Sequence, residues 1–177
     1  MKKLPLTSPQ FLYLENSFKE WLDILGYSPQ TMQSLPVHVR ELLYFLEQQG
    51  IHSVAQVQVS RIQEHYRNLK QRANQRRGGG LTNGSLNKHL QAIYKFAEYL
   101  RQSGRLKLPP LQLDWEAEDS EEITVLTPEE IRLLYKATEG YQKGTEWEPF
   151  NARDRAMLTI FYGGGLRRSE GYWLERW

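Results

Sequence analysis

The chain has 177 residues and a formal net charge of +2 at pH 7, and 40% of its residues are hydrophobic. This apolar content is enough to bury a core, so wholesale disorder is excluded. Cysteine is absent, which excludes disulfides, thiolate metal sites and cysteine nucleophiles. The N-terminus lacks the apolar run of a signal peptide, and no window approaches the roughly 18 apolar residues of a membrane span. We therefore expect a soluble, cytoplasmic protein.

The small net charge conceals an asymmetry along the chain. Residues 1–113 hold 15 lysines and arginines against 7 aspartates and glutamates, whereas residues 114–177 hold 8 against 14. A basic front half favours a polyanionic partner. On charge alone, an ordinary solvated surface explains the same numbers equally well.

Four segments of the front half carry apolar residues at helical spacing. The first two begin at Ser8 and Ser28, each followed by a proline, which combines a capping serine with a first-turn proline. Pro36 lies inside the second segment. Because proline lacks an N–H and clashes with the preceding turn, we expect it to kink this helix or split off its first turn. A third helix is expected over about 60–75.

The fourth helix is expected to begin at residue 82 or 83, after a basic loop that contains three consecutive glycines. Together the four segments predict a helical bundle over residues 1–112. Acidic side chains dominate residues 113–122, so we expect an extended, solvated linker there. A second unit over 123–177 opens with a threonine cap, a proline and two glutamates, the pattern of a capping box.

Four stretches of the sequence occur in a distinctive order. They are Tyr27-Ser-Pro-Gln-Thr31, Ser85-Leu-Asn-Lys-His-Leu90, Leu126-Thr-Pro-Glu-Glu-Ile131 and Gly165-Leu-Arg-Arg-Ser-Glu170. In order and spacing they resemble the tyrosine recombinases, the phage-integrase and Xer-type family, over essentially the whole chain. The last stretch, which follows Arg153-Asp-Arg155, is the strongest match, because this family places the first arginine of its active site there.

The resemblance implies a mainly α fold: a four-helix SAM-like core-binding bundle, followed by a helical fragment of the catalytic domain. It implies a parent protein that cuts and rejoins double-stranded DNA through a covalent phosphotyrosine, in site-specific recombination or integration. Self-association on DNA as a tetramer is implied as well. No metal or nucleotide cofactor and no membrane partner is expected.

By this resemblance Arg167 is the catalytic arginine. An arginine after a glycine-rich turn at a helix start can donate two parallel hydrogen bonds to a phosphate, beside backbone N–H groups. The alternative is a surface arginine in a capped turn. Ser169 and Glu170 are expected to cap the next helix and to orient Arg167.

The family's other catalytic groups are a lysine, a His-x-x-Arg pair, a further histidine or tryptophan, and the nucleophilic tyrosine. They lie downstream of the matched motif and none is present, so we expect the front of a recombinase, cut short after Arg167. Tyr162 and Tyr172 flank the motif and are interpreted as packing residues rather than nucleophiles. The apolar helix over 156–162, which carries Leu158, Ile160 and Phe161, is then expected to expose apolar surface and to promote association.

A DNA-contacting face is predicted on the fourth helix, on the side opposite its apolar stripe, with a second basic cluster in the preceding loop. The predicted DNA-binding residues are Arg72, Arg76, Arg77, Ser85, Asn87, Lys88, Gln91 and Lys95. Thr31, Gln33 and Arg40 on the second helix are weaker candidates. A solvated polar face is the alternative for each of them.

Other site chemistry finds no support in the sequence. The four histidines show no paired metal-ligand spacing and have no cysteine partners, so no metal site is expected. Three functions stay open. The chain is part of a DNA breaking-rejoining enzyme, a catalytically inert module that occupies recombination sites, or a helical protein-interaction domain without affinity for DNA.

Overall fold

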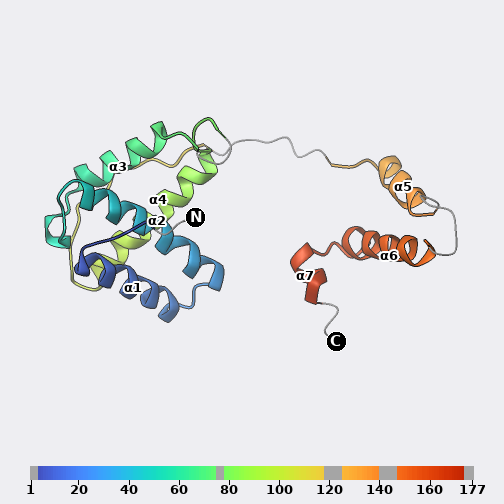
Figure 1. Ribbon diagram of the computed structural model, residues 1–177, viewed down its shortest axis with the longest axis horizontal. Helices are drawn as coiled ribbons and strands as arrows, with labels where there is room; N and C mark the ends of the chain where they lie inside the picture. Colours follow the sequence, from blue (N-terminus) through green and yellow to red (C-terminus); the bar gives the residue numbers. More distant parts are fainter. Residues whose placement is uncertain (1–3, 75–77, 118–124, 140–146, 174–177) are drawn as a thin grey trace. The chain divides into compact units, whose positions relative to one another are not determined.

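The computed structural model describes residues 4–74, 78–117, 125–139 and 147–173. The chain divides into two units between residues 120 and 121 (Figure 1). In chain order the elements are α1 (Pro9–Ile24), α2 (Pro29–Gln48), the 3₁₀ turn η1 (Val54–Gln56), α3 (Val59–Gln71), α4 (Asn83–Gln102), α5 (Pro128–Ala137), α6 (Glu148–Leu158), the π-helical turn η2 (Thr159–Gly163) and α7 (Arg168–Trp173). The described residues contain no β-strand, so the expected mainly α fold is confirmed.

Short polar side chains cap the starts of α1, α2, α4 and α5, as the sequence predicts. The hydroxyls of Ser8, Ser28 and Thr82 each accept the backbone N–H three residues further on, at the starts of α1, α2 and α4. At the start of α5, Thr127 and Glu130 form the full capping box. Each such cap contributes about 1 kcal/mol, because it satisfies a backbone donor that the helix itself leaves free.

Pro36 does not divide the second helix. α2 runs from Pro29 to Gln48 with Pro36 inside it, so the expected loss of its first turn does not occur. Leu35, Pro36 and Val39 are all buried on the side of α2 that faces the core. Packing on both sides of the proline therefore holds the helix together against a local cost of about 3 kcal/mol.

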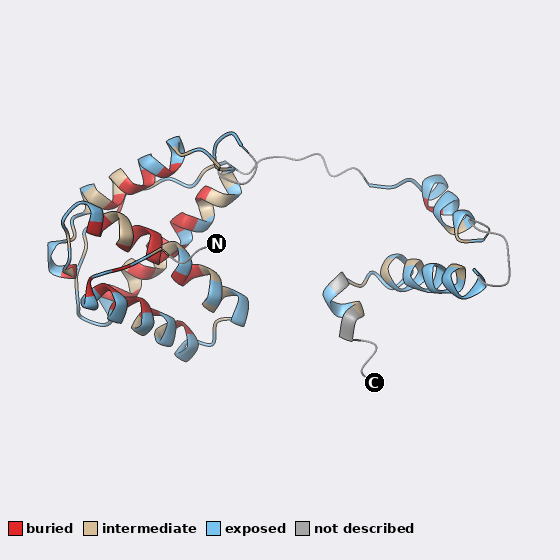
Figure 2. Cartoon of the chain, viewed as in Figure 1, coloured by how far each residue is buried: buried red, intermediate tan, exposed pale blue. Residues whose placement is uncertain are grey.

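The core of the first unit lies between α1, α2 and α4, and buried residues gather on their facing sides (Figure 2). The Phe18 ring is at its centre, with its centroid 5.5 Å from that of Phe96 and 5.7 Å from that of Tyr99. A second cluster joins α3 to α4 through Tyr66, Leu69, Leu86 and Leu90. Helix α3 thus completes the four-helix arrangement.

The segment after α4 also belongs to the first unit. Leu111 is buried in the core. The Tyr94 hydroxyl donates to the Leu113 carbonyl at 2.7 Å, and the Tyr94 ring stacks on Trp115 with centroids 6.0 Å apart. Leu113 and Trp115 therefore contact Tyr94 of the bundle, within the range 113–122 over which the sequence predicts a solvated linker.

Glu116 fastens the end of this segment to α3 and α4. Its carboxylate accepts the Tyr66 hydroxyl at 2.7 Å and pairs with Lys70. Its backbone exchanges two hydrogen bonds with the Asn87 side chain, at 2.9 and 3.0 Å. Glu116 therefore has a tyrosine and a lysine as partners within the fold. The number of acidic residues in the segment gives no sign of these contacts. Residues 118–122 of the predicted linker lie outside the described part.

The second unit contrasts with the first in burial. Ile131 is the one buried residue among its described positions. Leu133, Phe150, Met157 and Ile160 are large hydrophobic residues that remain exposed on α5, α6 and η2 (Figure 2). No helix in the described part of the chain is both long enough and apolar enough to cross a membrane.

Candidate nucleic-acid interface

Helix α4 carries three of the predicted DNA-binding side chains on its outer side. Lys88 and Gln91 are exposed, as expected for residues opposite the buried stripe. Lys95 is half-buried: its ammonium pairs with Glu98 at 2.9 Å and lies 5.7 Å from the centre of the Tyr27 ring. Lys88 is therefore the cation of this face most available to an external anion, because Lys95 already has a carboxylate and a ring as partners.

Two other predicted residues of α4 make contacts within the fold. Ser85 accepts the Thr82 hydroxyl at 3.0 Å and is part of the helix cap. The Asn87 side chain holds the backbone of Glu116. The polar atoms of Asn87 are thus engaged by the returning segment, and local sequence gives no sign of this long-range pairing.

A hollow of about 330 Å³ lies where α2, α4 and the chain after α3 meet. We call it the α2–α4 hollow. Its lining residues are Val37, His38, Glu41, Arg72, Ala73, Asn74, Leu81, Ser85, Lys88 and His89. Three of the predicted DNA-binding residues therefore line one concavity, and two of these three are cationic.

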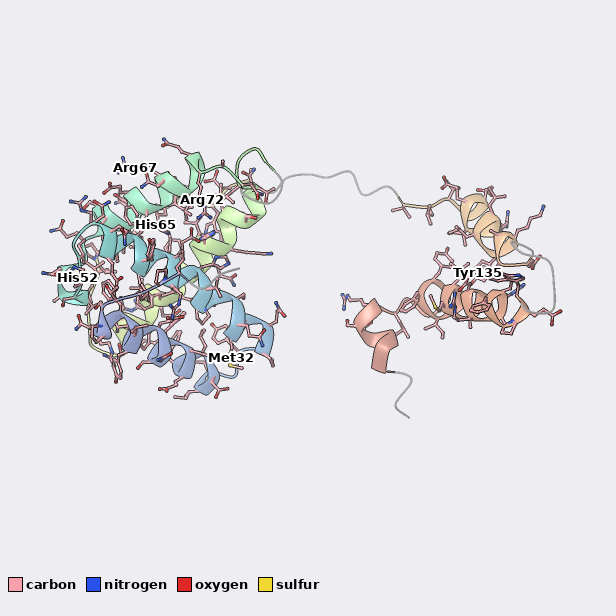
Figure 3. All side chains as sticks on the ribbon, viewed as in Figure 1. Met32, His52, His65, Arg67, Arg72 and Tyr135 are labelled. Atoms are coloured by element: carbon pink, nitrogen blue, oxygen red, sulfur yellow. The ribbon has the colours of Figure 1, made fainter. Side chains whose placement is uncertain are left out.

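Arg72 stands at the C-terminal end of α3 (Figure 3). Its guanidinium forms an ion pair with Glu41 of α2, and its side chain is 35% exposed. A phosphate that approaches Arg72 therefore meets a guanidinium whose charge is partly neutralised. Arg76 and Arg77, the other members of the predicted basic cluster, lie outside the described residues.

The weaker candidates on α2 divide between two environments. Gln33 is exposed, and Thr31 contributes its backbone N–H and hydroxyl to the cap of α2. Arg40 is buried: its guanidinium pairs with Glu15 of α1 and donates to the Leu4 carbonyl at 2.8 Å. The expectation that Arg40 contacts DNA is therefore wrong, because a buried ion pair between α1 and α2 occupies all of its side chain.

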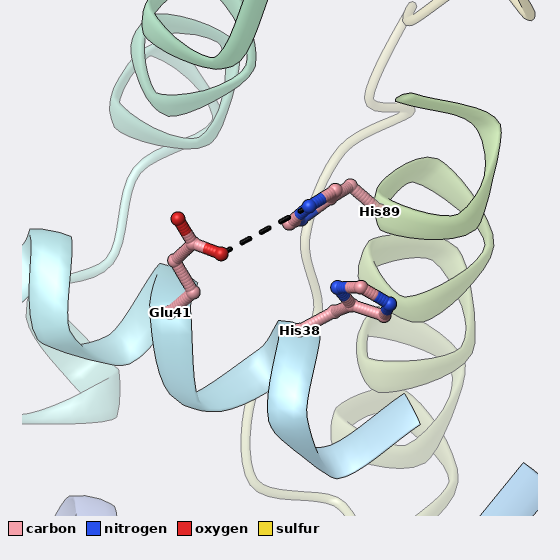
Figure 4. A group of neighbouring side chains, drawn as sticks. All are labelled: His38, Glu41 and His89. Atoms are coloured by element: carbon pink, nitrogen blue, oxygen red, sulfur yellow. Dashed lines mark ion pairs between the residues drawn. The ribbon is translucent and has the colours of Figure 1, made fainter. Parts of the chain in front are cut away.

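The hollow also contains a group of titratable side chains that the sequence did not predict. His38 and Glu41 lie one turn apart on α2, and His89 of α4 faces them (Figure 4). The rings of His38 and His89 are 4.2 Å apart, centroid to centroid. Burial lowers the pKa of His38, and burial together with the neighbouring His38 lowers that of His89 to about 3. A search for i, i+3 histidine–carboxylate spacing on a single helix would have found the first two.

In the second unit, Arg167 precedes α7 in a capped turn. Its carbonyl accepts the N–H groups of Glu170 and Gly171, and the Glu170 carboxylate accepts the Arg167 N–H at 2.7 Å. The predicted capping role of Glu170 is thus present, whereas Ser169 makes no cap bond with a described residue. The Arg167 side chain is 84% exposed and its guanidinium is 3.4 Å from Glu170. This local geometry fits both an arginine open to a phosphate and a surface arginine.

Comparison with known proteins gives a domain match and a set of relatives. The family profile of the phage integrase N-terminal SAM-like domain matches residues 16–104, which contain α2, α3 and α4 and most of α1. A tyrosine recombinase XerC of Haemophilus influenzae is 30% identical over 148 residues. The XerC 2 recombinase of Ralstonia nicotianae is 27% identical over 161 residues, and an Actinobacillus succinogenes XerC is 28% identical over 171.

These alignments cover 81%, 89% and 92% of this chain, and 44%, 44% and 52% of the respective relatives. The chain thus spans about half the length of the curated relatives that it matches. No solved structure matches it. The profile match over half of the chain, on a unit with the expected helices, places this protein in the tyrosine recombinase family of phage integrases.

Proposed function

We propose that this chain supplies the DNA-recognition part of a site-specific tyrosine recombinase, and that the α2–α4 hollow and the adjoining face of α4 contact duplex DNA. The observation that carries the proposal is the SAM-like domain match over residues 16–104, on a unit whose hollow holds Arg72 and exposes Lys88. Lysine and arginine contacts to phosphate supply sequence-independent affinity, and Gln91 beside them offers a side chain that can read a base edge.

Lys88 is the main phosphate contact in this proposal. It is exposed and makes no ion pair with a described residue, whereas Arg72 pairs with Glu41 and Lys95 with Glu98. Each phosphate contact releases condensed counterions, so its loss removes about 0.9 from the slope of log affinity against log salt. At about 0.1 M salt, this amounts to a loss of about eightfold in affinity for one contact.

The test is fluorescence anisotropy with a labelled duplex across a salt series. We expect steep salt dependence for the intact chain and a smaller slope and weaker binding for Lys88→Ala. Lys107→Ala is the matched control: it removes the same charge from an exposed site beyond the opposite end of α4. Equal affinities and slopes for these two variants would contradict the proposed face, and absence of binding by a folded chain at low salt would contradict DNA recognition altogether.

In the parent enzyme we propose Arg167 as a catalytic arginine for cleavage and rejoining through a phosphotyrosine. Its 84% exposed side chain leaves the guanidinium accessible to a phosphate, and its contact with Glu170 restrains it. Two parallel hydrogen bonds from a guanidinium stabilise charge on non-bridging phosphate oxygens.

A chimaera tests this role: residues 1–177 replace the N-terminal part of the Actinobacillus succinogenes recombinase, whose alignment covers 92% of this chain. Arg167→Lys should reduce strand cleavage by about 10²–10³-fold, as loss of a charge-stabilising donor does. Arg132→Lys, at an exposed position of α5, is the control and should cleave normally. Normal cleavage by the Arg167 variant would leave this arginine without a catalytic role.

A second candidate is a DNA-binding module that acts without cutting. The closed core of the first unit favours it, because that unit buries its helices without help from the second. Strand cleavage by the chimaera distinguishes the two candidates. If the chain is a DNA-binding module that acts without cutting, the chimaera binds DNA and does not cleave it.

A further inference from the structure

The His38, Glu41 and His89 side chains make up the one group of histidine and carboxylate side chains in the described residues that is close enough to share a metal ion. One ligand atom from each lies within 4.8 Å of the others. The Glu41 Oε2 atom is 3.9 Å from the His89 Nε2 atom (Figure 4). Two of these residues come from α2 and one from α4, so an ion held by all three would connect the two helices.

The donor set suits a first-row divalent cation. Imidazole nitrogens and carboxylate oxygens are typical zinc ligands, and three protein ligands leave a position for water. His38 and the α2–α4 hollow provide a route for that water and for the ion, because His38 is half-buried and lines the hollow. Small side-chain movements bring ligand atoms at these separations to the distances that a tetrahedral ion requires.

Hydrogen bonding within the fold leaves the His89 imidazole available. The Nδ1 atom of His89 is buried and has no hydrogen-bond partner among the described residues. The fold therefore makes little use of this imidazole for its own hydrogen bonding, although burying an unpaired ring nitrogen is unfavourable.

The neighbouring cations both favour and oppose metal binding at this site. Arg72 pairs with the Oε1 atom of Glu41 and leaves Oε2 on the side of His89, as outer hydrogen-bond partners orient metal-binding carboxylates. Arg72 and Lys88 are also cations at the same hollow and oppose a divalent ion. We therefore expect affinity weaker than that of a four-ligand structural zinc site.

We propose that His38, Glu41 and His89 form a binding site for a divalent first-row transition metal ion of the zinc class, which ties α2 to α4 at the α2–α4 hollow. This inference is independent of the proposed DNA contacts. A bound ion adds a cross-link between α2 and α4, and so raises the stability of the first unit.

The experiment uses the full chain, without a polyhistidine tag and after treatment with chelator. Titration with Co²⁺ is followed by visible absorption, and Zn²⁺ is added in thermal melts. We expect one Co²⁺ per chain with the d–d spectrum of a nitrogen–oxygen site, displacement by Zn²⁺, and a higher melting temperature with Zn²⁺. A chain with no cobalt spectrum and no thermal shift would overturn the proposal.

Variants identify the ligands. His38→Gln and His89→Gln should each weaken Co²⁺ binding at least about tenfold, whereas His52→Gln should leave it unchanged, because His52 is exposed and lies outside the group. Circular dichroism without metal checks that each variant folds; His38→Gln decides the matter if the more buried His89→Gln does not. Cobalt binding by His38→Gln that equals that of the unaltered chain would assign the metal to another site and overturn the proposal.

Discussion

The two units of this chain differ most in how completely each buries its own apolar residues. The first surrounds Phe18, Leu42 and their neighbours with four helices and a returning segment, whereas the described part of the second buries Ile131 alone. The two units therefore hold their polar side chains in place in different ways. The first positions its polar groups by its own packing, and the second presents Arg167 on a short, exposed helix start.

Core packing should give the largest difference between the units. Phe18→Ala removes a fully buried ring from the first unit and should cost about 3–5 kcal/mol in the free energy of unfolding. Met157→Ala, at an exposed site of α6, should change it by less than about 0.5 kcal/mol. Urea denaturation followed by circular dichroism measures both. Similar losses for the two variants would mean that burial is not what distinguishes the units.

Ion pairs should show the same contrast. Arg40→Met leaves Glu15 buried without its partner and should cost about 3–5 kcal/mol. Arg132→Met breaks an exposed pair with Glu129 on α5 and should cost about 0–1 kcal/mol. Denaturant titration of the two variants tests this, and a negligible cost for Arg40→Met would show that the pair between α1 and α2 does not hold the first unit together.

Acid should weaken the first unit through its buried histidines. Burial lowers the pKa of His65 to about 4 and that of His89 to about 3, against about 6.5 in an unfolded chain. Between these values the unfolded state binds more protons than the folded state. The stability that the neutral histidines contribute is therefore fully present above about pH 6.5. It decreases as the pH is lowered below that value, by up to about 1.4 kcal/mol per pH unit for each histidine. Unfolding free energies measured from pH 7 to pH 4 test the slope.

The variant His65→Phe tests how much of this loss of stability in acid comes from His65. The substituted ring does not titrate and can lie against Phe45, whose centroid is 5.1 Å from that of His65. This variant should lose less stability between pH 7 and pH 4 than the unaltered chain does. An unchanged pH slope would assign the acid sensitivity to other groups.

The smallest expected effect is on DNA affinity, at Asn87, and it distinguishes a structural role of this residue from a DNA contact. Asn87→Ala removes two hydrogen bonds to the Glu116 backbone and should cost about 1–3 kcal/mol of stability. DNA affinity should stay close to that of the unaltered chain, because the Asn87 side chain is engaged within the fold. A folded Asn87→Ala chain that binds DNA as weakly as Lys88→Ala would return Asn87 to the DNA-binding face.

Local patterns predicted most of the helices. The caps at Ser8, Ser28 and Thr127 depend on residues within one turn, so sequence alone was enough to place them. Of the two effects expected of Pro36, loss of the first turn of α2 does not occur, because burial of its neighbours on α2 is a tertiary property that local sequence does not show. The outer position of Lys88 followed from the helical period of α4.

Long-range pairing accounts for what the sequence did not predict. Arg40 looks like a surface arginine until α1 brings Glu15 to it, 25 positions away in sequence. Glu116 lies in an acidic segment, and nothing in that local composition indicates its hydrogen bonds to α3 and α4. His38 and His89 come into contact only because α2 packs on α4. Partners far apart in one sequence leave no local periodicity by which to recognise them.

Duplex binding by residues 1–120, compared with binding by the full chain, shows whether the first unit recognises DNA by itself. We expect the shorter chain to fold and to keep its affinity within about tenfold, equivalent to about 1.4 kcal/mol, with the same steep salt dependence. A folded 1–120 chain that does not bind duplex DNA at low salt, under conditions where the full chain binds, would contradict this expectation.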